Sequence, residues 1–566
     1  MNTIEIVLFL TAVAGVIGFG IYQGRQALDD SAGKVSGYFL AGRHLTWYLV
    51  GFSLIAANIS TEQFVGMSGQ AAGSLGMAIA SYEWMAAVTL VAVAFVFLPK
   101  FLKTGIYTVP EFLEYRFDPV SRVVMAIATL SILLGGPIAS VIYAGALVIS
   151  EYYLSVPILG NLVACCWLIG LLSAAYVFLG GLKACAWTDL IWGASLIVGG
   201  AIVAYLAFDA LGMADPASLV KTAILKDVTV DELAEAGSWE RFQLLNAGTA
   251  EEGGKLHMVR PLSDTDIPWS ALIVGLWIPN IFYWGFNQYI IQRALGSRTL
   301  AEGQQGIIFA SFLKLIIPFV IVIPGIVAFN LYYEQMALEG GGYAYDTAFP
   351  TLLRNLVKPF PWISWFILAA LFGAIVSSLA SMLNSASTVA TMDLWRKISP
   401  NASDDNLIRT GRILVIVFVI IATLIAPHLG QFNAIFKYIQ EIQGFISPGI
   451  IAIFAFGMLV PKAPRFLGWS ALLLNAVLYG ALKFFLADMI SGAGLWYANE
   501  IAFLDRMAIC LFIVCAYCGT MTLLKPLPEP VVLPVNEDMD MTSSPKVKML
   551  GYGVIAATVV LYIIFW

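Results

Sequence analysis

The sequence predicts an all-α membrane protein with about fourteen transmembrane helices. Of its 566 residues, 60% are hydrophobic and only 12% are charged, whereas soluble globular proteins carry about 25% charged residues. The hydrophobic residues gather in long stretches, and a bilayer core about 30 Å thick needs roughly 20 such residues in a helix. These observations exclude a water-soluble protein of this length.

Fourteen apolar stretches account for most of the chain. They lie near residues 6–22, 46–68, 75–98, 122–149, 156–180, 185–208, 268–291, 304–332, 361–392, 411–430, 440–460, 466–486, 502–524 and 549–566. The first stretch has no basic segment before it and no clear cleavage site, so we expect a retained helix and not a signal peptide.

The distribution of Lys and Arg predicts the orientation. With the N-terminus outside, nineteen basic residues, among them Arg122 and Arg293, fall in inner loops and five in short outer loops, which is the bias that membrane insertion favours. We therefore expect both termini outside. The polar segment 209–267, with eleven acidic and five basic residues, is expected to be an external loop with short helices.

Composition also excludes several functions. A net charge of −6 and the lack of a basic stretch argue against nucleic-acid binding. Three histidines and six cysteines without metal-ligand spacing argue against a metal enzyme, and we interpret the Cys515/Cys518 pair as packing. No nucleophile elbow or Walker A sequence is present, so neither hydrolase chemistry nor ATP-driven transport is indicated.

Two of the fourteen helices contain polar interruptions. The second changes from an apolar run to Asn58-Ile59-Ser60-Thr61-Glu62-Gln63 at mid-depth, which predicts a helix that unwinds and exposes its carbonyls. The seventh contains Pro279 and Asn280, followed by Gly285; proline removes a backbone donor. Intramembrane polar residues mark functional sites by default.

Five helices separate these two interruptions. Helices 2–6 (46–208) and 7–11 (268–460) would then form two five-helix repeats, and an odd number of helices inverts the second. Interrupted helices in inverted repeats indicate a secondary-transport site at the membrane midplane. The remaining parts are 1–45, a first helix and inner loop; 209–267, the external loop; and 461–566, peripheral helices 12–14.

Further polar residues lie in separate helices. Glu83 and Lys314 either form a structural ion pair or both face a polar ligand. Ser377 and Ser378 are adjacent, so both cannot face one packed neighbour. Two hydroxyls, with carbonyls from an unwound helix, suit a monovalent cation that must also be released.

At these residues the sequence resembles the solute:sodium symporter family, specifically its sodium/glucose–galactose branch and, within that branch, bacterial sodium/galactose symporters. The resemblance spans nearly the whole chain. The stretches that carry it are Ala56–Phe64, Ser81–Trp84, Tyr176 with Gly180–Leu182 and Trp187–Asp189, Tyr283–Tyr289, and Ser377–Ser385.

The resemblance implies a leucine-transporter-type core of two inverted five-helix repeats, helices 2–11. It also implies site residues. Substrate contacts would be Gln63, Glu83, Asn280, Lys314 and Gln440; gates would be Met67, Tyr82, Tyr283 and Phe436; sodium ligands would be Ala56, Ile59, Ala374, Ser377 and Ser378; and Asp189 would lie on the ion exit path. Pro137 and Ala86 stand where relatives can carry polar groups, which bears on the choice of sugar.

These residue types suit a hexose. Carboxylates accept hydrogen bonds from hydroxyls, an ammonium donates, amides do both, and an aromatic ring such as Tyr283 covers the apolar C–H face. We therefore expect sodium-driven import of galactose or glucose. Alternatives are another polyol such as inositol, a sugar acid, or a non-transporting sugar sensor. An ion channel and a membrane enzyme fit less well, because bulky aromatics favour an occluding pocket and no catalytic motif is evident.

The expected ligands are a small sugar and the co-transported sodium ion, with no organic cofactor and no nucleic acid. The expected environment is a bacterial inner membrane, crossed many times. A monomer suffices for this activity. The sequence leaves open which sugar is carried and how many sodium ions accompany it.

Overall fold

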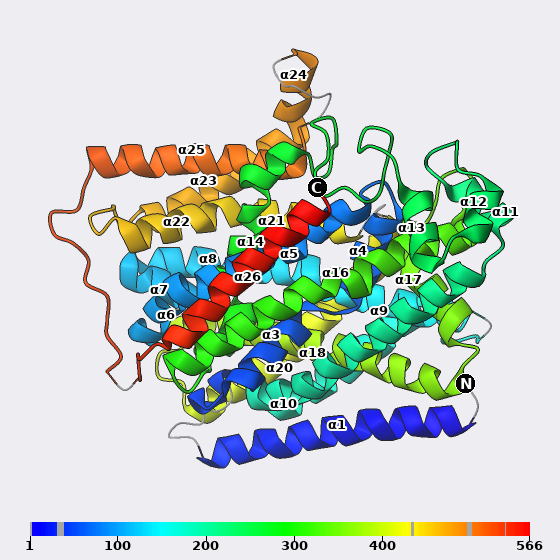
Figure 1. Ribbon diagram of the computed structural model, residues 1–566. Coiled ribbons are helices and arrows are strands. Elements are labelled where there is room, and N and C mark those ends of the chain that lie inside the picture. Colours follow the sequence, from blue (N-terminus) through cyan, green and yellow to red (C-terminus); the bar gives the residue numbers. More distant parts are fainter. Residues whose placement is uncertain (1–2, 31–38, 155, 432–434, 495–500, 538) are drawn as a thin grey trace.

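The computed structural model describes residues 3–30, 39–154, 156–431, 435–494, 501–537 and 539–566, and within these ranges its regular structure is helical. Figure 1 shows the helices packed side by side, with α1 along one edge of the bundle and α25 along the opposite edge. The longer helices are α1 (Thr3–Asp30), α5 (Ser81–Ala92), α8 (Pro119–Leu133), α9 (Ala139–Tyr152), α10 (Leu162–Met213), α16 (Leu300–Met336), α18 (Pro361–Val389), α20 (Asp404–Ile425), α22 (Ser447–Leu459), α23 (Leu467–Ala481), α25 (Phe503–Leu524) and α26 (Pro545–Ile564).

The fourteen predicted stretches each overlap an apolar helical segment. Ten helices in the described residues are long and apolar enough to cross a membrane, and the bent pair Ile435–Gly444 with Ser447–Leu459 makes an eleventh. Three shorter apolar helices complete the set: Trp47–Asn58, Leu162–Ala175 and Ala271–Phe286. The fifth predicted stretch, from Leu162 onward, and the whole of the sixth lie within α10.

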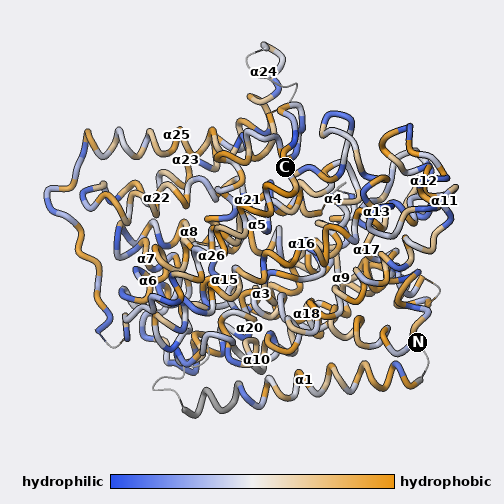
Figure 2. Tube along the Cα trace, viewed as in Figure 1, coloured by the Kyte–Doolittle hydropathy of each residue, from blue (hydrophilic) through white to orange (hydrophobic). Residues whose placement is uncertain are grey.

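The outer faces of the peripheral helices are apolar. Figure 2 shows hydrophobic residues along the length of α1 and α25. Leu10 of α1 is 57% exposed and Phe512 of α25 is 62% exposed. Such surfaces are unfavourable in water and are matched by lipid chains, as expected for a membrane protein.

The second predicted stretch is interrupted where the polar residues occur. Helix α3 (Trp47–Asn58) ends, Ile59 and Ser60 adopt extended backbone angles, and α4 (Thr61–Ala72) begins. The amides of Gln63 and Phe64 donate to the Ser60 carbonyl. The Ile59 carbonyl therefore lies outside the hydrogen-bond ladder of α4. A backbone acceptor is thereby exposed deep in the bundle.

The seventh stretch is interrupted later than the position of its proline. Helix α14 (Trp277–Ile281) contains Pro279 and continues through a π-helical turn, η7 (Phe282–Phe286), before Asn287 turns extended and α15 (Gln288–Leu295) begins. An earlier π-helical turn, η6 (Ala271–Gly275), precedes Pro279. This π-helical turn shifts the backbone hydrogen-bond register before Pro279 is reached. Helix α14 therefore contains the proline without a break in the helix.

The interrupted helices lie among the longest helices of the bundle. Helix α16 packs against α3, α4 and α5, and α10 packs against α3 and α18. Helix α15 contacts both α3 and α18. The two interruptions are therefore buried and held from several sides.

The segment 209–267 forms short helices, as predicted: α11 (Pro216–Leu219), α12 (Val230–Glu235) and α13 (Ser238–Asn246). They gather at one end of the bundle in Figure 1. The Nζ atom of Lys255 donates to the carbonyl of Ala72, the last residue of α4, over 2.6 Å. Burial lowers the pKa of Lys255 to about 7. The segment therefore covers one end of an interrupted helix.

The C-terminus meets this segment. The amide of Met258 donates to the carbonyl of Phe565 over 2.8 Å, and His257 Nδ1 lies 2.7 Å from the carbonyl oxygen of Trp566. The segment 209–267 and the C-terminus therefore lie at the same end of the bundle, so one labelling experiment orients both.

A cysteine placed at Val230, which is 41% exposed, should react with a membrane-impermeant maleimide added outside intact cells. The reason is the excess of basic residues in the opposite loops. The matched control is a cysteine at Asn401, in a loop predicted to be inside, which should react only after permeabilisation. Labelling of residue 230 from the cytoplasmic side alone would contradict the predicted orientation.

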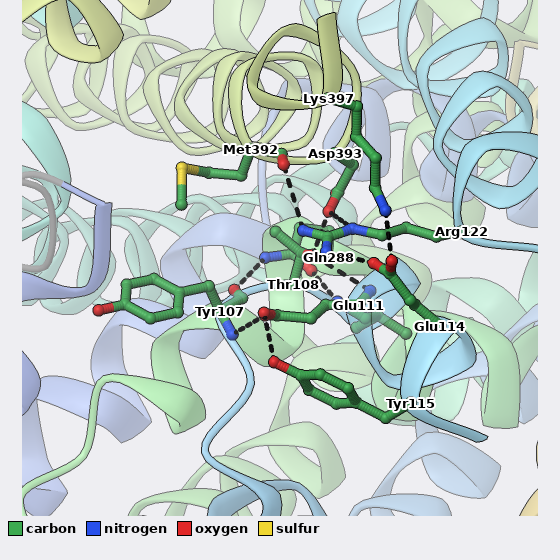
Figure 3. Close-up of polar contacts among 11 residues, drawn as sticks. Tyr107, Thr108, Glu111, Glu114, Tyr115, Arg122, Gln288, Met392, Asp393 and Lys397 are labelled. Carbon is green, nitrogen blue, oxygen red and sulfur yellow. Dashed lines mark hydrogen bonds and ion pairs between the residues drawn. The ribbon is translucent and has the colours of Figure 1, made fainter. Parts of the chain in front are cut away.

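A polar cluster joins four elements at the other end of the bundle (Figure 3). Arg122 of α8 pairs with Asp393 of the π-helical turn η10 (Ala390–Trp395) over 2.6 Å and with Glu114 of α7 (Val109–Arg116) over 2.6 Å. Thr108, which caps α7, donates to Asp393 over 2.8 Å. Gln288 at the start of α15 accepts from the amide of Val109 over 2.8 Å. The cluster therefore ties α15 to the surrounding bundle.

Replacing Asp393 with alanine should lower the free energy of unfolding by about 3–5 kcal/mol, because it leaves the Arg122 guanidinium without its most buried partner. The Asp393 side chain has no exposure, whereas that of Glu114 is 22% exposed. Glu114→Ala, the control, should cost about 1 kcal/mol. Thermal unfolding in detergent measures both, and equal losses would contradict the assignment.

Candidate functional site

A cavity lies where the two interrupted helices approach α5 and α21 (Ile435–Gly444). Four of the five predicted substrate residues line it: Gln63 of α4, Glu83 of α5, Asn280 of α14 and Gln440 of α21. They come from four separate helices, so the fold alone brings them together. This convergence of polar groups in an apolar bundle identifies the cavity as the candidate ligand site.

Lys314 is placed differently from the other four. It is fully buried on α16 and does not line the cavity. Its ammonium forms an ion pair with Glu83 and also donates to Asn58. Its Nζ atom lies 5.1 Å from the centre of the Trp284 ring. Lys314 therefore lies outside the cavity, and its ion pair holds the Glu83 carboxylate in position in the cavity wall.

The cavity wall carries unpaired acceptors. The carboxamide oxygens of Gln63, Gln440 and Gln443 have no hydrogen-bond partner among the residues that the structure describes. The side-chain nitrogen of Asn280 donates to the Leu276 carbonyl over 3.0 Å. The carboxamide oxygen of Asn280 is the group that can accept a hydrogen bond from a ligand. Buried polar groups need partners, and a ligand that brings hydroxyl donors supplies them.

Gln443 was not predicted from the sequence. It lies three residues after Gln440 on α21 and therefore on the same helix face. The three-residue spacing from Gln440 is the sequence feature from which Gln443 could have been predicted. Ala86 and Pro137, the two positions noted as departures from the family pattern, also line the cavity, so their apolar surfaces shape its wall.

Aromatic residues bound the cavity. The rings of Tyr82 and Phe436 meet edge to face with centroids 4.9 Å apart. The Tyr283 hydroxyl accepts from Asn58 over 2.9 Å and from the Tyr289 hydroxyl over 2.6 Å. These contacts join α5 to α21 and α3 to η7 beside the cavity, and the gating roles of Tyr82, Tyr283 and Phe436 stay predictions.

Met67, the fourth predicted gate, does not line the cavity. It is fully buried on α4. Its neighbour Gly66 packs closely on α21, since an added Cβ would lie 2.9 Å from the Phe436 Cβ. Met67 therefore belongs to the packed layer beside the cavity.

Two of the five predicted ion ligands, Ser378 and Ala56, meet at the interruption between α3 and α4. The Ser378 hydroxyl of α18 lies 3.0 Å from the Ala56 carbonyl oxygen. Ile59 carries the carbonyl that neither helix uses, and Ala374 lies one turn before Ser378 on the same buried face. Hydroxyl and carbonyl oxygens are ligands that alkali cations accept, so the donor set fits sodium.

Ser377 points to a different partner. Its hydroxyl donates to Asp189 of α10, as does the hydroxyl of Ser53. The Nη2 atom of Arg293 lies 3.6 Å from the same carboxylate and also donates to Ser381. Asp189, predicted on the ion path, is therefore one hydrogen bond away from a predicted sodium ligand.

Arg293 was assigned from the sequence to an inner loop, and that assignment was wrong. It is fully buried in α15, where it donates to Ser53, the Tyr289 carbonyl and Ser381. The predicted seventh stretch ended at residue 291. The helix instead restarts after Asn287 and carries Arg293 into the core.

A polar cavity beside a cation-suited interruption, inside an apolar helical bundle, is the arrangement expected of an ion-coupled membrane transporter. The sodium:solute symporter family model matches residues 38–466. The chain belongs to this family. It is a multi-pass, sodium-coupled solute symporter and not an enzyme, as predicted.

Individual relatives agree with this membership. The chain is 36% identical to a "Sodium/glucose cotransporter" of Vibrio parahaemolyticus, covering 100% of this chain and 99% of the relative. It is 30% identical to "Sodium/myo-inositol cotransporter 2" of Mus musculus, covering 84% of this chain and 69% of that one.

Solved structures establish the fold. A sodium-coupled sialic acid symporter, solved in a substrate-bound outward-open state, superposes with a TM-score of 0.67 at 20% identity, covering 94% of this chain and 99% of the other. This likeness confirms the predicted leucine-transporter-type fold. The residue boundaries of the two repeats stay predictions.

Proposed function

We propose that the chain imports a neutral hexose, galactose or glucose, together with sodium across a bacterial inner membrane by alternating access, with both termini outside. The supporting observation is the cavity wall, where the Glu83 carboxylate lies with three carboxamide oxygens that have no hydrogen-bond partner among the described residues. Each sugar hydroxyl donates one hydrogen bond. A site built this way rejects analogues that leave its polar groups unpaired.

In this proposal the sugar contacts are Gln63, Glu83, Asn280 and Gln440, with Lys314 holding Glu83 in place and Tyr283 covering the apolar sugar face. Sodium binds the Ala56 and Ile59 carbonyls, the Ala374 carbonyl and the Ser377 and Ser378 hydroxyls, and leaves past Asp189. Sodium then links α3 to α18. This link fixes the position of the interruption between α3 and α4. Asn58 and Gln63, on either side of the interruption, line the sugar cavity.

The sodium gradient supplies enough energy. One sodium ion crossing roughly 150 mV gains about 3.5 kcal/mol, and a tenfold concentration gradient adds about 1.4 kcal/mol. Their sum sustains roughly a four-thousandfold gradient of an uncharged solute. One ion per sugar is therefore sufficient for accumulation.

Uptake of labelled galactose, glucose and myo-inositol into proteoliposomes, with and without an inward sodium gradient, tests the proposal. Sodium-dependent accumulation of a hexose is expected. Myo-inositol is the second candidate, because a relative at 30% identity is named for it and its ring also presents hydroxyl donors. Sugar binding without uptake would instead indicate a sensor.

A further inference from the structure

Glu62 is a second carboxylate in the cavity wall. It lies in the first turn of α4, is 7% exposed and lines the cavity together with Glu83. Its Oε2 atom accepts a hydrogen bond from the Ser60 hydroxyl. Among the described residues of the cavity wall, no Lys, Arg or His is present. The wall is therefore acidic.

The buried charges near the cavity leave Glu62 unmatched. Lys314 is paired with Glu83, and Arg293 lies beside Asp189. Two acids and two bases thus offset one another in pairs. Glu62 takes part in neither pair.

We propose that Glu62 restricts the substrate to uncharged sugars, by acting as the counter-charge of the bound sodium ion. With sodium present, the buried charges sum to zero only when the solute is neutral. A sugar acid would add a carboxylate beside Glu62, in a cavity that offers acceptors and no free cation. Uncompensated buried charge is strongly unfavourable. This inference deepens the proposed function and rests on it.

The test compares two ligands of the same shape. Galacturonate and galacturonamide differ only in a carboxylate against a neutral carboxamide at C6. Each competes with labelled galactose for uptake into proteoliposomes at saturating sodium. For the unmodified chain, galacturonate should inhibit about a hundredfold less well than galacturonamide, as expected for like charges a few ångströms apart in a protein interior.

Glu62→Gln keeps the side-chain shape and its acceptor for Ser60 but removes the charge. This variant should need more sodium for half-maximal galactose uptake, because the ion loses its counter-charge, and at saturating sodium galacturonate should gain at least about tenfold in inhibition relative to the amide. Glu62→Asp keeps the charge and should keep the discrimination. The matched control is Glu251→Gln in the exposed external segment, which should behave as the unmodified chain.

Two results would overturn the inference. One is a Glu62→Gln protein that takes up galactose but excludes galacturonate as strongly as before. The other, which needs no variant, is galacturonate inhibiting the unmodified chain as well as galacturonamide does. Absence of sodium-driven galactose uptake in the unmodified chain would instead overturn the proposed function itself, so the two failures are distinguishable.

Discussion

Replacing Glu83 or Lys314 with alanine is expected to reduce sugar uptake by at least about a hundredfold. The two side chains form an ion pair between α5 and α16, with Lys314 fully buried. Removing either partner leaves the other charge buried and unpaired, which costs about 3–5 kcal/mol. Glu83→Ala also removes a carboxylate from the cavity wall. Sodium-driven uptake into proteoliposomes measures the loss.

The double variant separates ligand binding from stability. Glu83→Ala with Lys314→Ala removes both charges, so thermal stability should recover relative to either single variant while uptake stays absent. Glu251→Ala, in the exposed external segment, is the control for the substitution itself and should retain uptake. Recovery of transport in the double variant would show that the pair is structural and does not serve the substrate.

The sequence predicted the cavity because its residues violate the rule for lipid-spanning helices. Gln63, Glu83 and Asn280 lie within apolar stretches, where an unpaired polar group is unfavourable, whereas Gln440 was implied only by the family resemblance. The polar run at Asn58–Gln63 located the first interruption for the same reason. In both cases a local chemical conflict marked the site without any knowledge of contacts.

Features that depend on three-dimensional neighbours were not predictable in this way. Lys314 appeared equivalent to Glu83 as a ligand group, but its position behind Glu83 follows from how α16 packs on α5. The second interruption falls at Asn287 and not at Pro279, because a π-helical turn precedes the proline. Local composition does not reveal that register shift.

For a related reason, the sequence could not show whether basic residues near helix ends lie in loops or in the buried core. Arg293 and Arg122 both fit the loop bias used for orientation. Their buried partners, Asp189 and Asp393, lie 104 and 271 residues away in the sequence. Only the folded chain shows that these arginines are core groups.

Replacing Ser378 with alanine should raise the sodium concentration needed for half-maximal uptake by at least about tenfold. The Ser378 hydroxyl lies 3.0 Å from the Ala56 carbonyl oxygen at the interruption of α3 and α4, so its loss would remove one of the proposed sodium ligands. Ser377→Ala should have a lesser effect, because that hydroxyl bonds to Asp189.

The same variant tests the coupling between ion and sugar. Coupling free energy is reciprocal, so if sodium raises sugar affinity by some factor, the sugar raises sodium affinity equally. Sugar affinity in Ser378→Ala should therefore fall at ordinary sodium and recover at very high sodium. Glu83→Ala should show no such recovery, because its defect lies in the sugar cavity. Calorimetric sugar titrations across a sodium series measure both, and an unchanged sodium dependence would leave Ser378 a packing residue.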